Sequence, residues 1–147
     1  MMRVLLLAPH ASDLPDLPRE VENLKSVLDV TVVENGEIKL LDAIKNAEYE
    51  GLWIASHADA DGVMLDNHER LDARAIAQYA AAIKAKWIVI NSCESYELVE
   101  QIQYFYPVDV VAASTKRLGD RPAWRTAALI ARHLARTENL RESLRLA

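Results

Sequence analysis

Cysteine is nearly absent from this sequence, because Cys93 is the only one among 147 residues. A chain with one cysteine can form no internal disulfide, which is typical of a reducing compartment, and we expect a cytoplasmic protein. Long apolar runs are absent too, and stretches such as VLLLA at 4–8 are far shorter than a membrane-spanning helix. The amino-terminal stretch passes into a proline-rich loop without a small-residue cleavage pattern, so we expect no signal peptide.

Glycine is also scarce, with four residues in the whole chain, at positions 36, 51, 62 and 119. The sequence therefore has no glycine-rich loop of the kind with which many nucleotide-binding domains cradle phosphate. It also has no acidic pair directly after the first predicted strand, which a receiver domain would need. Both absences argue against a flavodoxin-like signalling or nucleotide-binding domain.

Positive charge is concentrated near the carboxyl-terminal end of the chain, although the net charge is −5. Residues 1–115 carry 9 Lys and Arg against 19 Asp and Glu, whereas residues 116–147 carry 8 against 3. Four arginines fall near one face of the last predicted helix: Arg121, Arg125, Arg132 and Arg136. This face contacts either solvent or an acidic partner or nucleic acid, and we favour solvent because no aromatic residues are interleaved with the arginines, as a base-stacking surface would need. We therefore expect no nucleic-acid binding.

Short apolar runs alternate with helical patterns along the chain. The runs predict strands at 3–8, 30–33, 52–56, 87–90 and 108–114. Apolar stripes predict helices over 17–28, 76–83, 98–105 and 124–134, and a weaker one over 38–47. This alternation predicts an α/β fold, a three-layer sandwich with a mostly parallel central sheet. We expect a single domain, 1–147, in which 138–147 are either a frayed helical tail or a contact for a partner.

Two reactive residues follow neighbouring strands of the predicted sheet. In parallel sheets, ligands bind outside the carboxyl ends of the strands, where His57 follows one predicted strand and Cys93 follows the next. A thiol and an imidazole in one crevice form the minimal nucleophile and base, since the imidazole supports the thiolate and later protonates the leaving amine. Taken singly, each residue has an ordinary alternative: a small buried thiol for Cys93, and a hydrogen-bonding loop residue for His57.

Two blocks of the sequence resemble the CHAT family, the bacterial relatives of caspases and separase. In that family a strand ends in His, usually followed by Gly, and a short excursion and a helix come next. An aliphatic strand then ends in a small residue, Cys, Glu and a small residue. Here SHADADG at 56–62 resembles the first block and SCES at 92–95 the second, with 36 residues from His57 to Cys93. The stretches at 3–28 and 108–135 are similar to the family as well, so the resemblance covers most of the chain.

The resemblance implies the caspase-haemoglobinase fold and a cysteine endopeptidase that cleaves a protein or peptide substrate without a cofactor. By this resemblance His57 is the general base and acid, Cys93 is the nucleophile, and the backbone N–H groups of Ala58 and Cys93 form the oxyanion site. Ala58 stands where the family usually has Gly, and alanine fits there if its φ is negative, whereas a positive φ would be strained. This substitution and the compact chain leave an alternative: a catalytically inactive caspase-like module that binds a regulatory protein partner.

The stretch HADADG has two further interpretations. The alternation of His57, Asp59 and Asp61 is similar to a metal-binding loop, but a calcium loop would need an oxygen ligand in place of His57 and a Glu in place of His68. We therefore expect no metal. The two aspartates either solvate the loop or line a substrate groove and attract a basic peptide segment.

Three more polar residues lie at the same predicted edge. Asn91 stands two residues before Cys93, where some relatives have an acidic residue that binds a basic P1 side chain, so we expect no strong Arg or Lys selectivity there. Glu94 is a second groove candidate, or a carboxylate that stabilises a helix N-terminus. His10 follows the first predicted strand and is the reserve base if His57 points away.

Overall fold

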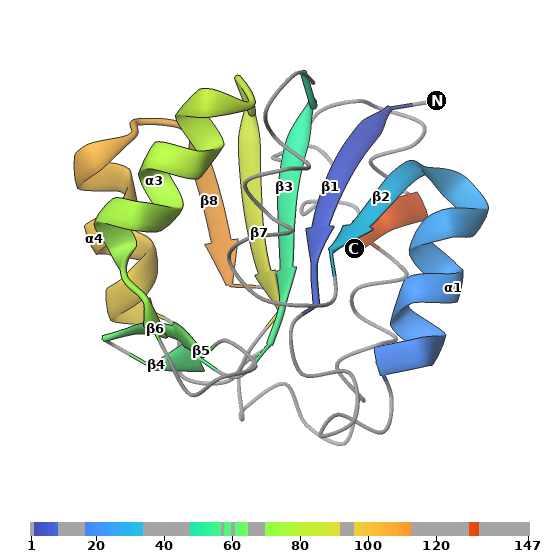
Figure 1. The fold of residues 1–147 in the computed structure, drawn as a ribbon, viewed down its shortest axis with the longest axis horizontal. Coiled ribbons are helices and arrows are strands. Elements are labelled where there is room, and N and C mark those ends of the chain that lie inside the picture. Colours follow the sequence, from blue (N-terminus) through green and yellow to red (C-terminus); the bar gives the residue numbers. More distant parts are fainter. Residues whose placement is uncertain are drawn as a thin grey trace.

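A computed structural model of the chain describes residues 2–8, 17–33, 48–56, 58–59, 61–64, 70–91, 96–112 and 130–132. Its centre is a five-stranded sheet in the order β2-β1-β3-β7-β8, in which every neighbouring pair is parallel (Figure 1). The strands are β1 (Arg3–Leu7), β2 (Asp29–Val33), β3 (Gly51–Ala55), β7 (Trp87–Asn91) and β8 (Asp109–Ala112). Each strand lies at a predicted apolar run, so the prediction of an α/β fold with a mostly parallel sheet is confirmed.

Helices cover both faces of this sheet. The helix α1 (Leu17–Val27) lies on one face, and α3 (Ala73–Ala82) and α4 (Tyr96–Phe105) lie on the other (Figure 1). Residues 130–132, from the last predicted helix, are helical and pack on the α1 face, whereas the weaker prediction at 38–47 lies outside the described residues. No helix among the described residues is long and apolar enough to cross a membrane.

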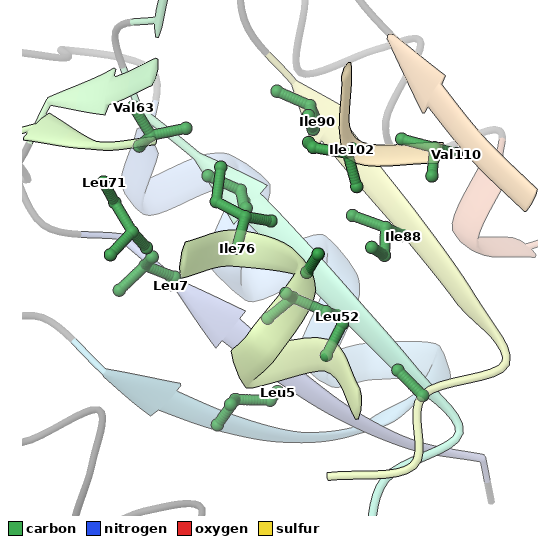
Figure 2. Packing of buried hydrophobic residues seen from close by; sticks show 14 of the residues in the cluster. Leu5, Leu7, Leu52, Val63, Leu71, Ile76, Ile88, Ile90, Ile102 and Val110 are labelled. Atoms are coloured by element: carbon green, nitrogen blue, oxygen red, sulfur yellow. The ribbon is translucent and has the colours of Figure 1, made fainter. Parts of the chain in front are cut away.

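The central strands β3 and β7 are apolar along most of their length because their residues pack into a core on both faces of the sheet. All five residues of β3 and of β7 are buried. On the α3 and α4 face, alternate strand residues pack with helix residues (Figure 2), among them Leu5, Leu52, Ile54, Ile88, Ile90, Ile76 and Ile102. On the α1 face the core includes Val4, Leu6, Trp53, Val89, Leu24, Leu28 and Ile130. Burial of this kind explains why the strand runs are continuous and not alternating.

Local signals set the bounds of α3. Asp72 has extended backbone angles, and its Oδ1 accepts a hydrogen bond from the N–H of Ala75 at 2.8 Å, as an N-cap does. After the helix, Lys84 has a φ of 57°, which turns the chain toward β7. Lys84 is held in place by an ion pair of 2.8 Å with Glu48.

A second, three-stranded antiparallel sheet follows β3, and the sequence did not predict it. It consists of β4 (Ala58–Asp59), β5 (Gly62–Met64) and β6 (Arg70–Leu71). Strands of two or three residues are too short to show a period, which explains the missed prediction. Gly62 has a φ of 140°, and a Cβ at this position would collide with the Leu71 carbonyl. Val63 and Leu71 of this sheet are buried against the α3 face of the main core (Figure 2).

Candidate functional site

The edge of the sheet that the sequence selects is built on β3 and β7, which are direct neighbours. They pair in parallel from Gly51 with Trp87 to Ala55 with Asn91, and each pair is separated by 36 residues of sequence. The expectation that these two strands lie side by side is therefore confirmed. The same 36 residues separate His57 from Cys93, so each stands two residues beyond the last pair of this register.

Covalent geometry limits how far these two residues can lie from the strand ends. Two residues of chain span at most roughly 7 Å, so neither Cα can be further than that from the end of its strand. Neighbouring strands are about 4.8 Å apart. His57 and Cys93 themselves lie outside the described residues, and so do His10 and Glu94, so their side-chain positions stay predictions.

The backbone at Ala58 adopts a conformation that alanine accepts. Ala58 begins β4 and pairs with Val63 of β5 in an antiparallel ladder. Among the described residues other than glycine, Lys84 alone has a positive φ. The strain that a left-handed conformation would impose at position 58 is therefore absent, and alanine has no steric cost to the backbone here.

The two aspartates of HADADG lie in the hairpin between β4 and β5. Asp59 ends β4, and Asp61 lies in the turn with an exposed side chain. No group of three His, Cys, Asp or Glu residues within the described ranges is arranged to hold a metal ion. The backbone of this hairpin brings the aspartates to the segment that directly follows His57.

Asn91, the last residue of β7, is buried and makes a specific contact with α1. Its side chain is 8% exposed, and its Nδ2 donates a hydrogen bond to the Oε1 of Glu20 in the first turn of α1. Glu20 is 4% exposed, which is rare for a carboxylate. Asn91, a predicted groove residue, is thus hydrogen-bonded to Glu20, which is not among the predicted site residues.

Glu20 lies in an almost entirely apolar environment that changes its acidity. Burial raises the pKa of Glu20 from 4.5 to about 7, although Asn91 and, more weakly, the indole of Trp53 favour its ionised form. The indole contact lacks the geometry of a regular hydrogen bond, because Trp53 Nε1 has no such partner among the described residues. Asn91 Oδ1 and Trp87 Nε1 are also buried without a hydrogen-bond partner among the described residues. Unpaired polar atoms of this kind are rare within a core, since buried polar atoms normally have a hydrogen-bond partner.

A sequence signal for Glu20 existed. The apolar stripe of the first predicted helix contains Leu24, and Glu20 is four residues before it, on the same face. A carboxylate inside an apolar stripe predicts either a buried partner or a helix that begins later. The structure shows the first case, with Asn91 as the partner.

A separate cavity of about 600 Å³ lies at the opposite edge of the sheet, where the strands begin. Its lining residues are Met2, Arg3, Glu48, Tyr49, Glu50, Lys84 and Lys86. The charges around it are mutually paired, Lys84 with Glu48 at 2.8 Å and Lys86 with Glu50 at 3.0 Å, while the Arg3 guanidinium lies 5.0 Å from the Tyr49 ring centre. The described residues that line it include no cysteine, serine or threonine, and both lysines are engaged in ion pairs, so we favour the carboxyl edge as the catalytic site.

Comparisons with known proteins do not assign the chain to a family. No family model matches the sequence, and neither a curated protein nor a solved structure is detectably similar to it.

Proposed function

We propose that the chain is a cytoplasmic, CHAT-type cysteine endopeptidase with the caspase-haemoglobinase fold, in which Cys93 is the nucleophile and His57 the general base and acid. The observation that carries this proposal is the pairing of β3 with β7, in which each residue of β7 lies 36 positions after its partner in β3. The same spacing brings the His57 and Cys93 segments out of the sheet at one edge. Residues that follow the carboxyl ends of adjacent parallel strands can reach one substrate.

The small antiparallel sheet gives further support. The resemblance implies a short excursion between the histidine and the following helix, and β4, β5 and β6 occupy this interval before α3. Strand order does not discriminate, because flavodoxin-like sheets share the order found here. The scarcity of glycine disfavours that alternative, since phosphate loops depend on it.

The proposed reaction needs only groups of this chain and water. The Cys93 thiolate attacks the scissile carbonyl, and the N–H groups of Ala58 and Cys93 bind the oxyanion of the tetrahedral intermediate. Protonated His57 donates its proton to the leaving amine, which departs and leaves a thioester on Cys93. His57 then accepts a proton from water as the water attacks the thioester, and the acid product leaves with the Cys93 thiolate and protonated His57 restored.

A second candidate function is a catalytically inactive caspase-like module that binds a protein partner. The observation that favours it is an aromatic pair on the outer face of α4, where Tyr104 is 84% exposed and Phe105 is 49% exposed. The two rings meet edge to face at 5.2 Å, and the guanidinium of Arg74 lies 6.0 Å from the centre of the Phe105 ring. Aromatic residues and arginine are enriched in protein interfaces.

Labelling of the single cysteine separates the two candidates. We expect peptidyl acyloxymethyl ketones with varied P1 residues to alkylate Cys93 at pH 7, and His57→Ala to lower the rate at least about 100-fold because the thiolate loses its base. The measurement is the mass of the intact chain against time, with His68→Ala as the matched control. Equal rates for wild type and His57→Ala would reject the peptidase and leave the partner-binding module.

A further inference from the structure

A buried hydrogen bond links the first turn of α1 to the last residue of β7. It joins Glu20 to Asn91, which are 71 residues apart in sequence, and both side chains are buried. Asn91 is also the last paired residue before Cys93, two positions away. A change at Glu20 therefore acts on the end of the strand from which the proposed nucleophile follows.

The direction of this hydrogen bond depends on whether Glu20 carries a proton. An ionised carboxylate can only accept, and it does so from Asn91 Nδ2. A neutral carboxyl group can also donate its O–H, and Asn91 Oδ1 is a buried acceptor without another partner among the described residues. Proton uptake by Glu20 thus offers the Asn91 amide a second orientation, rotated by about half a turn.

The other neighbours of Glu20 are neutral. From β3 it is approached by the Trp53 indole and from β7 by Asn91. Burial and these two side chains account for the pKa of Glu20, so no charged group among the described residues acts on it. On α1 itself the nearest charged residues in sequence, Arg19 and Glu22, are exposed. Protonation of Glu20 is therefore the main change of charge in the described part of this core.

We propose that Glu20 is a positioning residue for Cys93. Glu20 holds the end of β7 through Asn91, and the protonation of the Glu20 carboxyl group controls the reactivity of the Cys93 thiol. This inference rests on the proposed function, because it assigns Glu20 a role in preparing the nucleophile. Ionised Glu20 places a negative charge at Asn91, two residues before Cys93 in the sequence, and a like charge disfavours a thiolate. Neutral Glu20 removes this charge and gives Asn91 Oδ1 its missing donor.

The test is the pH profile of Cys93 alkylation by iodoacetamide in the full chain from pH 5.5 to 10. Glu20→Gln keeps a donor and an acceptor for Asn91 but cannot ionise. We expect the wild-type profile to contain a step near pH 7, where Glu20 titrates, that is absent in Glu20→Gln. We also expect the variant to react up to roughly tenfold faster at pH 8, because the loss of the carboxylate charge favours the thiolate. Glu22→Gln, an exposed change on the same helix, is the control and should match wild type.

A second readout requires no variant to fold. The side-chain amide resonance of Asn91 in the wild-type protein should shift with the same midpoint as the alkylation step, because the partner atom of the amide changes. A Glu20→Gln profile that superimposes on wild type, or an Asn91 amide that does not titrate between pH 5.5 and 8.5, would overturn the inference.

The two proposals can fail separately. An ordinary imidazole titrates near neutral pH, so the step assigned to Glu20 must persist in His57→Ala and vanish in Glu20→Gln. If His57→Ala reacts with peptidyl probes as fast as wild type while Glu20→Gln still loses its step, the peptidase is rejected and the positioning role of Glu20 stands. If His57→Ala slows the reaction with peptidyl probes and Glu20→Gln keeps the wild-type step, the peptidase proposal stands and the positioning role of Glu20 is rejected.

Discussion

Glu20→Gln is expected to raise the free energy of unfolding by about 3 kcal/mol at pH 8 and to leave it almost unchanged at pH 4. In the folded protein the pKa of Glu20 is about 7, whereas an unfolded chain has the ordinary value near 4.5. The folded state therefore binds more protons than the unfolded state between these two values, and stability falls as the pH rises through this window. Below it both states are protonated, and above it the full cost of burying the charge is present. Glutamine removes that cost.

Chemical denaturation at a series of pH values measures this effect. The difference between Glu20→Gln and wild type should grow from pH 4.5 to pH 7 and then level off. Glu22→Gln, on the exposed side of the same helix, should show no such growth. A difference that stays constant across the whole range would show that Glu20 does not change its proton affinity on folding.

Asn91→Asp is expected to destabilise the protein by about 3–5 kcal/mol at pH 8, because it places a second carboxylate next to buried Glu20. Two like charges in one buried site cannot both ionise without a large cost, so one of them must keep a proton. The loss of stability appears as the pH rises above the ordinary carboxyl pKa, and it is regained as the pH falls below it. The structure thus gives a physical reason for an asparagine, and not an aspartate, at position 91.

The double variant Glu20→Gln/Asn91→Asp provides the matched control. It restores one carboxylate and one amide with their places exchanged, so its stability at pH 8 should return to within about 1 kcal/mol of wild type. Thermal or denaturant unfolding of the four proteins forms a double-mutant cycle. A double variant that stays as unstable as Asn91→Asp alone would mean that the Glu20 carboxylate is not what makes Asn91→Asp costly.

Much of the fold was predictable because the strands are buried on both faces. Continuous runs such as LWIAS at 52–56 and WIVI at 87–90 give a signal that few other structures produce, and the structure has β3 and β7 there. Helix ends were predictable where a local residue decides them, as Pro107 does after α4. The small sheet of β4, β5 and β6 escaped, because it depends on the turn at Gly62 and on contacts with Leu71 and not on a repeating pattern.

The candidate site was predictable only in part, for a related reason. The strand ends that precede His57 and Cys93 follow from the fold class, since parallel strands end at a common edge. The partnership of Glu20 with Asn91 crosses 71 residues of sequence and joins a helix to a strand. No periodicity contains such a contact, and only the carboxylate within the apolar stripe of α1 indicates that a partner exists.

The most direct test of the peptidase proposal is the distance from Cys93 Sγ to the nearer imidazole nitrogen of His57 in a crystal structure of the full chain. The proposal predicts both side chains on one side of the sheet, at the hydrogen-bond distance of about 2.6–3.2 Å or somewhat longer without substrate. Side chains on opposite faces of the sheet, or more than about 7 Å apart, would contradict it.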